Sequence, residues 1–420
     1  MIRAGRSRLK LWGAEGDAII VDCDRPWRLI LWEKASYVPC WDLGNDVWFT
    51  PEWMETHSPE DPHCYEPIMD KDCRYSRAEL LETGPARAAV RWDYALCDSL
   101  YRVFWGNTRA RERYHVYPDG VAVRHLAGFP GDESGDQINA VLWEVQEFIV
   151  VNGVGVHPED IIEPMGFTLT NLAGDTIELK WPNPFDSYTH LCRVYPQIAD
   201  WPEYIGLVHL RNHPDPFVAF SHNPLLFPHA ECAECGKPHP QICGFAGAAN
   251  YSHWPANDST DFVGWVEAEP EEVGKRATHT SFFSTGYSYA GKTPPRPSSW
   301  LFLTGAAPGG VEEARALAGS WLSPARVAES SQLYEGYAYS ERAYRFRVSR
   351  PGSTKIRLAP SRPIINPVLR LFFAAPPVKV LWDGVELGPS EFIEQAVGGD
   401  LVIWINRTLD RETSLEVIPA

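Results

Sequence analysis

The chain has 420 residues, a formal net charge of -17 and a hydrophobic fraction of 44%. This apolar content is ordinary for a folded protein and excludes wholesale disorder. The negative charge and the lack of long basic runs argue against nucleic acid or an anionic membrane surface as partner. The 17 Trp and 17 Tyr residues suit stacking on sugar rings and predict a carbohydrate partner, although a β core rich in aromatic residues explains them equally well.

The N-terminal sequence has basic residues but no apolar run followed by a small-residue cleavage site. No stretch reaches the roughly 20 apolar residues of a membrane span. The sequence as it stands therefore predicts a cytoplasmic protein, or a secreted one if a signal peptide has been removed. The 9 Cys are odd in number and irregularly spaced outside one cluster, which fits reduced thiols better than a disulfide framework.

Most of the chain predicts short strands separated by Gly, Pro, Asn and Asp. Asp119 and Gly120 lie between two alternating runs and predict a hairpin with a two-residue turn, in which both residues adopt positive φ. We predict an all-β fold whose large, supersandwich-like β-sandwich covers residues 1–330. The clearest strands of this part are 17–23, 87–96, 111–118, 120–129 and 147–153.

The segment 309–324 is the one convincing helix, because it opens with acidic residues and ends before Pro324. Its apolar residues at helical spacing are Val311, Ala314, Leu317, Ala318 and Trp321. After residue 335, six short apolar segments separated by turns predict a small accessory β-sandwich over 335–420.

Three long segments of the large domain read as loops, and loops of this length are usually functional. They are 50–78, 181–204 and 221–262.

The sharpest local motif is HAECAECGKPHPQIC, residues 229–243, which places two Cys, a His and a third Cys at metal-ligand spacing. Four such ligands in one short loop predict a structural Zn²⁺ site, which replaces the core that the loop lacks. A closed site of this kind has no catalytic role, and no organic cofactor is expected. The alternative is an ordinary loop with free or disulfide-linked Cys. The predicted zinc ligands are Cys232, Cys235, His239 and Cys243.

A second constellation is CYEPIMDKDCRYS, residues 64–76, in which charged residues alternate with Cys, Met, Pro and Tyr. This mixture indicates partial burial, and buried charges must be paired or used, so we predict the wall of a functional pocket. The alternative is a solvated charged loop held by mutual salt bridges. The candidates are Glu66, Asp70, Lys71, Arg74 and Tyr75.

Three further segments contribute candidates. The strand end at 152–164 carries Asn152, Asp160 and Glu163, which are either substrate-binding groups or parts of a surface turn. His253 beside Trp254 offers a proton-transfer group next to a sugar-stacking ring, although a lone His is more often structural. Aromatic residues of 34–53 suit a sugar-binding wall or, equally, a core. They include Tyr37, Trp41 and Trp48.

The motifs SYVPCW, EPIMDKDCRYS, YHVYPDGVAVR, VVNGVGVHPEDIIEP and YSHWP, in this order over about residues 28–325, resemble a group of bacterial polysaccharide-degradation proteins, the ulvan-lyase-like polysaccharide lyases. The resemblance implies a lyase that cleaves a glycan or oligosaccharide containing uronic acid. The Cys-rich loop and the missing secretion signal depart from that group. A cytoplasmic member would act on imported oligosaccharides instead of polymers.

β-Elimination needs a cation or hydrogen-bond donor on the uronate carboxylate, a base for the C5 proton and an acid for the leaving oxygen. Arg74 and Lys71 would neutralise the carboxylate. His253 would be the base, and Tyr75 or Tyr37 would be the acid or a partner base. This hypothesis requires the loops around Arg74, Asp160 and His253 to converge on one cleft.

Two alternatives stay open at the level of sequence. A glycoside hydrolase would use two carboxylates at a separation that decides retention or inversion. A non-catalytic glycan-binding protein would need only the two β-sandwiches and exposed aromatic residues. The carboxylates available to a hydrolase are Glu66, Asp70, Asp160 and Glu163.

Overall fold

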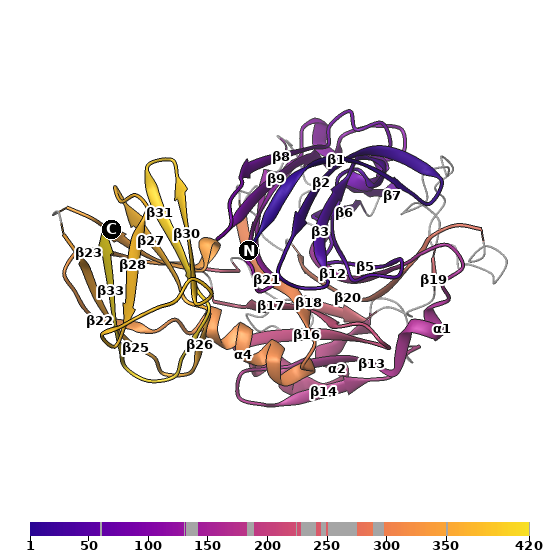
Figure 1. Ribbon diagram of the computed structural model, residues 1–420. Coiled ribbons are helices and arrows are strands. Elements are labelled where there is room, and N and C mark those ends of the chain that lie inside the picture. The colour runs from indigo at the N-terminus through magenta and orange to yellow at the C-terminus, as the bar shows by residue number, and fades with distance from the viewer. Residues whose placement is uncertain are drawn as a thin grey trace.

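The computed structural model describes residues 1–58, 61–129, 131, 142–182, 189–223, 225–227, 241–244, 249–250, 275–288, 298–349 and 352–419. For 57–58, 61–63, 142, 241–244, 249–250, 284 and 286–288 it describes the backbone alone. The described residues form antiparallel sheets for the most part, which confirms the predicted all-β fold. Figure 1 shows a large body of strands beside a smaller one, with helix α4 between and below them.

The large sandwich consists of two sheets. The first sheet contains β1 (Arg3–Leu11), β2 (Ala14–Asp22), β3 (Arg28–Trp32), β4 (Pro39–Asp42), β5 (Val47–Thr50), β6 (Glu55–Ser58), β7 (Asp61–Tyr65), β12 (Leu142–Asn152), β15 (Thr189–His190), β18 (Gln241–Gly244), β19 (Ala249–Asn250) and β20 (Thr278–Ser288). The second contains β8 (Arg77–Glu82), β9 (Ala88–Ala95), β10 (Arg109–Val116), β11 (Val121–Phe129), β13 (Ile162–Thr170), β14 (Thr176–Leu179), β16 (Glu203–Leu210), β17 (Asp215–Ser221) and β21 (Ser298–Ala307).

The two sheets of the large sandwich pack face to face around one hydrophobic core. Trp41 and Trp143 of the first sheet and Tyr94, Trp300 and Phe302 of the second belong to the same buried cluster. Strands such as β10 and β14 bury alternate side chains, as expected for strands with one buried face, whereas β3, β5 and β17 are buried on both faces.

The hairpin predicted around Asp119 and Gly120 is present, since β10 pairs with β11 in antiparallel register. Its turn differs from the prediction. The amide of Gly120 donates to the carbonyl of Tyr117 at 3.0 Å, and within Asp119–Gly120 only the glycine has positive φ, at 74°. Pro118 fixes a negative φ at the first turn position, so the chain forms a longer turn that ends in a left-handed glycine.

The small sandwich is built from the last part of the chain. One five-stranded sheet contains β22 (Arg326–Ser330), β25 (Thr354–Ala359), β33 (Thr413–Pro419), β28 (Val378–Trp382) and β29 (Val385–Glu386). The other contains β23 (Leu333–Ala338), β24 (Ala343–Arg347), β27 (Val368–Phe372), β31 (Asp400–Ile405) and β30 (Phe392–Val397). Strands β26 (Ile364–Ile365) and β32 (Thr408–Leu409) form a separate pair. Because β22 pairs with β25, residues 326–330 join the small sandwich, not the large one as predicted.

Three α-helices occur in the described part of the chain, and the predicted one is confirmed as α4. They are α1 (Pro158–Ile161), α2 (Leu191–Val194) and α4 (Gly310–Leu322). The 3₁₀ turns are Glu33–Ala35, Pro67–Met69, Phe104–Gly106, Pro196–Asp200 and Tyr339–Glu341. None of these described helices combines the length and apolarity needed to cross a membrane.

Charged residues join the two sandwiches. The buried guanidinium of Arg87 donates to Glu341 at 2.8 Å, and Arg370 donates to the same carboxylate at 2.5 Å. Arg342 forms a second buried ion pair with Asp119 at 2.8 Å. Both pairs are shielded from water, so they fix the small sandwich against the end of the large one.

Candidate functional site: a buried group of glutamates

Three segments of the first sheet gather an unusual set of buried acids. Strand β6 pairs with β12 on one side, where Glu55 lies opposite Glu144, and with β7 on the other, where Thr56 lies opposite Tyr65. This pairing brings the start of β6, the end of β7 and the first half of β12 together. The glutamates that these segments contribute are Glu52, Glu55, Glu66, Glu144 and Glu147.

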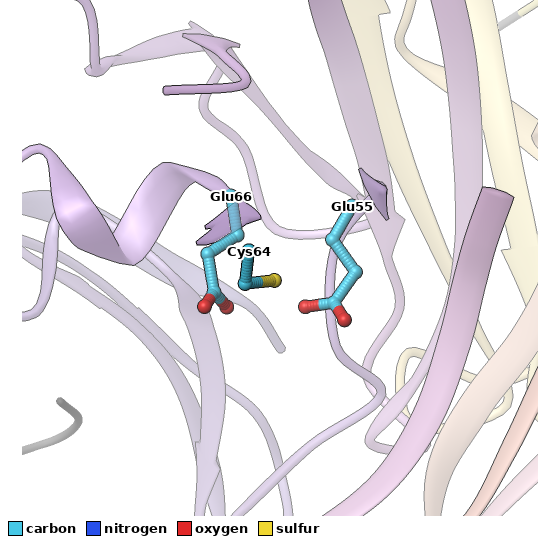
Figure 2. Close-up of side chains that lie close together, drawn as sticks. All are labelled: Glu55, Cys64 and Glu66. Atoms are coloured by element: carbon cyan, nitrogen blue, oxygen red, sulfur yellow. The ribbon is translucent and has the colours of Figure 1, made fainter. Parts of the chain in front are cut away.

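One part of the group consists of Glu55, Cys64 and Glu66, whose ligand atoms all lie within 4.8 Å of one another. Figure 2 shows the Cys64 thiol between the two carboxyl groups. The indole N–H of Trp53 donates to both carboxyls, at 3.0 Å to Glu55 and 3.2 Å to Glu66. One donor therefore holds two acids side by side, and both are buried, with exposed fractions of 7% and 2%.

The other part consists of Glu52, Glu144 and Glu147, which also place carboxyl oxygens within 4.8 Å of one another. Glu52 is fully buried, and its backbone has a positive φ of 70°. Neither of its carboxyl oxygens has a hydrogen-bond partner among the described residues. Strain and an unsatisfied buried carboxyl each cost on the order of 1–3 kcal/mol, so such a residue is a marker of function.

Burial and mutual repulsion perturb these acids. Burial raises the pKa of Glu66 well above its ordinary value, and the charge of Glu55 and a hydrogen bond with it raise it further. Burial, followed by the charge of Glu147, does the same to the pKa of Glu52. Burial and the nearby carboxylates also raise the pKa of the Cys64 thiol. Burial and the neighbouring charges therefore favour the protonated forms of Glu52 and Glu66, and they keep Cys64 a thiol.

A buried ion pair beneath the group positions two of its segments. The guanidinium of Arg124 donates to the backbone carbonyl of Pro51 at 3.0 Å and to that of Val145 at 2.9 Å. Its charge is neutralised by Glu112, which also accepts a hydrogen bond from the hydroxyl of Tyr94. Pro51 precedes Glu52 and Val145 follows Glu144, so Arg124 of the second sheet fixes the acids of the first.

Aromatic rings lie beside Glu66 and Glu144 in the sequence and contact one another in space. The ring of Tyr65 lies 4.9 Å from that of Phe104, and the Phe104 ring lies 5.9 Å from that of Trp143. Trp105 stacks on Phe104 at 4.6 Å, is only half-buried, and has a positive φ of 46°. Trp105 thus presents part of its ring to solvent from a strained backbone position.

This arrangement is suited to two kinds of chemistry. Adjacent carboxyl groups, one of them protonated, can act as a general acid and a base or nucleophile. Carboxylate oxygens are also the ligands that hard divalent cations prefer.

The predicted pocket wall at 64–76 is only partly a site. Asp70 is fully buried, but its carboxylate accepts the backbone amides of Arg74, Tyr75 and Ser76 at 2.7, 2.8 and 2.7 Å. It therefore shapes the loop and has little capacity left for a substrate. Lys71 is half-buried on the same loop. Glu66 is the one candidate of this segment that joins the glutamate group.

Arg74 and Tyr75 are also engaged locally. The exposed guanidinium of Arg74 pairs with Asp72 at 3.0 Å and lies over the ring of Tyr101 at 3.7 Å. The hydroxyl of Tyr75 donates to the carbonyl of Tyr101 at 3.0 Å. These contacts match the alternative of a loop held by its own interactions.

Two of the three aromatic candidates at 37–48 belong to the interior. Trp41 is fully buried and its indole donates to Thr304 at 3.3 Å, while Trp48 is buried with its ring 4.9 Å from that of Trp12. The prediction of a sugar-binding wall is corrected for these two residues, because their rings pack in the core. Tyr37 is half-buried, and burial followed by the charge of Glu33 raises its pKa to about 12.

The candidates at the end of β12 make their contacts away from the glutamate group. The side chain of Asn152 is buried and donates to Thr280 at 3.2 Å. Asp160 is exposed on α1, and Glu163 pairs with Arg211 at 3.2 Å on the surface. These two acids fit the alternative of a surface turn.

Several predictions fall outside what the structure describes. His253, Trp254, Cys232, Cys235 and His239 lie outside the described residues, and Cys243 is described by its backbone alone. The zinc site and the catalytic His253 therefore stay predictions.

Sequence reasoning missed Glu52, Glu55, Glu144 and Glu147. A signal was present in LWEVQEFIVVN, where acids and an amide interrupt a strand that is otherwise apolar. A buried strand with charged residues on it requires partners for them. The partners of the acids on β12 are set by the pairing of β6 with β12, and the local sequence pattern does not reveal this pairing.

No family model matches the chain, and no curated protein matches its sequence. Among solved structures, a predicted mutarotase (YeaD) from Salmonella typhimurium is similar at 11% identity and a TM-score of 0.33, over 72% of this chain and 92% of that one. Galactose 1-epimerase from Lactobacillus acidophilus NCFM is 9% identical with a TM-score of 0.27, over 68% and 100%. A copper-containing benzylamine oxidase from Hansenula polymorpha is 8% identical with a TM-score of 0.28, over 74% and 62%. At such low TM-scores none of these similarities assigns a function.

Proposed function

We infer that the protein is a carbohydrate-active enzyme in which Glu55 and Glu66 supply the acid–base chemistry. The observation that carries this proposal is the shared hydrogen bond from Trp53, which holds two buried carboxyl groups side by side. Two acids in one place with one proton between them form a minimal general acid–base pair. The aromatic cluster of Tyr65, Phe104, Trp105 and Trp143, in which Tyr65 directly precedes Glu66 in the sequence and Trp105 is half-buried, supports a sugar as the substrate class.

Hydrolysis of a neutral glycoside fits this site better than β-elimination from a uronate. Five neighbouring carboxyl groups would repel a uronate unless its charge were neutralised. Arg74, expected to serve that purpose, is bound to Asp72 and Tyr101 instead. The carboxyl oxygens of Glu55 and Glu66 lie within 4.8 Å of each other, which is too close for the roughly 6.5–9.5 Å spacing of inverting hydrolases and leaves the retaining reaction as the one to test.

In the retaining reaction, one glutamate protonates the leaving oxygen while the other attacks the anomeric carbon. Water then releases the sugar from the covalent ester, and the first glutamate takes the proton from that water. Both side chains are buried in the structure. A substrate therefore reaches them only after covering residues move aside.

The test is an assay of the full chain on neutral aryl glycosides and on oligosaccharides that contain uronic acid. We expect release of the aglycone from a neutral glycoside, without the ultraviolet absorbance of a C4–C5 double bond. Glu55→Gln and Glu66→Gln should each lower kcat by at least about 100-fold. The matched control is Glu178→Gln, an exposed acid on β14, which should leave kcat unchanged.

Three results would count against hydrolysis. Turnover that survives both substitutions would remove the acid–base role of the pair. An unsaturated product from a uronate would establish elimination, as the sequence resemblance implies. Binding of sugars without turnover of any of them would favour a glycan-binding protein.

A further inference from the structure

We propose that Glu52, Glu144 and Glu147 form a binding site for a divalent cation, and that Ca²⁺ is the ion that fits it. The three residues come from two segments, the stretch before β6 and strand β12. This inference does not depend on the hydrolase proposal, which concerns Glu55 and Glu66. Its readouts below are independent of activity.

The spacing of the oxygens suits an ion of this size. Each of the three glutamates places a carboxyl oxygen within 4.8 Å of the other two. Two ligands of one ion lie no farther apart than twice the metal–oxygen distance, which is about 4.6–5.2 Å for Ca²⁺ and about 4.2 Å for Mg²⁺. This limit allows the three oxygens to share one ion. Three carboxylates suit Ca²⁺, which takes most of its ligands from protein oxygens, better than Mg²⁺, which keeps several waters and binds one or two carboxylates.

A second observation, apart from the number of acids, is the unsatisfied state of Glu52. Its side chain is 0% exposed, and neither carboxyl oxygen has a hydrogen-bond partner among the described residues. One of these oxygens nevertheless lies within 4.8 Å of oxygens of Glu144 and Glu147. A buried carboxyl that lies against two others, with no donor from outside the triad among the described residues, is the arrangement that a cation would complete.

The neighbouring amide supports the same conclusion. Gln146 lies between Glu144 and Glu147 in β12, is fully buried, and has no partner for its amide oxygen or nitrogen among the described residues. Thr285 lies opposite Gln146 on β20, and its buried hydroxyl also lacks a described partner. Opposite residues of an antiparallel pair share a face of the sheet, so unsatisfied polar atoms cluster on this pair of strands.

The scaffold holds the ligands in place before an ion arrives. Arg124 donates to the carbonyls of Pro51 and Val145, which are neighbours of Glu52 and Glu144. The charge of Arg124 is already matched by Glu112. Arg124 therefore positions the backbone beside Glu52 and Glu144, while its own charge is matched by a different carboxylate.

Terbium provides a direct probe, because Tb³⁺ replaces Ca²⁺ at oxygen sites and emits when a nearby indole transfers energy to it. Trp143 directly precedes Glu144, so we expect strong emission from the full chain on excitation of tryptophan. Ca²⁺ should displace Tb³⁺ and, without Tb³⁺, should raise Tm by several degrees. Trp143→Phe should reduce the emission while the effect of Ca²⁺ on Tm persists.

The variants Glu52→Gln and Glu147→Gln should weaken Tb³⁺ binding at least about tenfold. They should also raise the Tm of the ion-free protein, because each removes a buried carboxylate. In both variants, Ca²⁺ should no longer raise the Tm further. Glu178→Gln should change none of these readings. Absence of saturable Tb³⁺ binding to the wild type, or of any rise in Tm with Ca²⁺, would overturn the proposal. Equal Tb³⁺ affinity of both variants and the wild type would do the same, by assigning the ion to other acids.

Discussion

Glu112 and Arg124 form a two-point ion pair inside the large sandwich, with Nε–Oε2 and Nη2–Oε1 distances of 2.6 and 2.8 Å. Both side chains are fully buried. The other nitrogen of Arg124 donates to the carbonyls of Pro51 and Val145 in the facing sheet. The pair therefore links the two layers at the point where the buried glutamates gather.

Arg124→Lys should destabilise the protein by at least about 3 kcal/mol, because an ammonium cannot reproduce this planar fork and leaves Glu112 buried without its full complement of donors. Urea unfolding followed by tryptophan fluorescence measures the loss. Arg111→Ala is the control, since Arg111 is 49% exposed and pairs with Asp93 on the surface. That change should cost less than about 1 kcal/mol. Similar losses for both variants would contradict the structural role of Arg124.

Trp53→Phe should remove the one indole N–H that Glu55 and Glu66 share. Trp32→Phe is a matched control, because Trp32 is equally buried but its N–H has no partner among the described residues. Both changes lose a similar volume of ring. Trp53→Phe should therefore cost about 1–3 kcal/mol more than Trp32→Phe in free energy of unfolding. A difference near zero would show that the shared hydrogen bond contributes nothing.

Asp70→Ala should cost at least about 2 kcal/mol, because three backbone amides lose their shared acceptor. Asp72, two residues away, is 61% exposed and contacts Arg74 at the surface. Asp72→Ala should change stability by less than about 0.5 kcal/mol. Thermal unfolding of the two variants measures this contrast. If Asp70 instead bound substrate, its loss would lower activity and leave Tm near that of the wild type.

Acid should weaken the junction between the sandwiches through His115. Burial, followed by the charge of Arg87, lowers the pKa of His115 to about 3, and its Nδ1 lies 2.8 Å from the carbonyl of Ser340. The unfolded chain binds this proton near pH 6.5. Stability from neutral His115 is therefore complete above about pH 6.5 and is lost as pH falls towards 3.

Glu341 acts in the same direction at lower pH. Burial alone would raise its pKa, but the charges of Arg87 and Arg370 outweigh burial and lower the pKa to about 2. Its contribution is present above about pH 4.5 and disappears as pH falls towards 2.

The stability difference between wild type and His115→Gln should shrink between pH 6.5 and 3. A difference that stays constant over that range in urea unfolding would contradict this assignment.

The strands and the helix α4 could be predicted because alternation, turn residues and helical spacing are local signals. The small sandwich and the β10–β11 hairpin were recognised in this way. The turn differs from the prediction, because Pro118 holds a negative φ at the first turn position and the Asp-Gly pair alone does not reveal this constraint. Local patterns therefore gave the elements more reliably than the backbone geometry between them.

The candidate site was accessible to prediction only in part. Glu66 was recognised because charged residues crowd its segment, yet its partner Glu55 comes from a neighbouring strand. Glu144 and Glu147 come from β12, far along the chain, and meet Glu52 only through the pairing of β6 with β12. Asp70 and Arg74 carried the same sequence signal as Glu66, but backbone amides and a surface partner occupy them. Residue type indicated a polar segment, and only three-dimensional pairing separated the members of the glutamate group from residues that hold their own loop together.

The turn at Tyr339–Glu341, together with Arg342, has a consequence for engineering this protein. A chain that stops after α4 would deprive Arg87 of Glu341, His115 of the Ser340 carbonyl and Asp119 of Arg342. The large sandwich would then expose Arg87, His115 and Asp119 to water without these partners. The two sandwiches should accordingly unfold in a single thermal transition. A different C-terminal domain could replace the small sandwich only if it supplied a carboxylate in place of Glu341 and a guanidinium in place of Arg342.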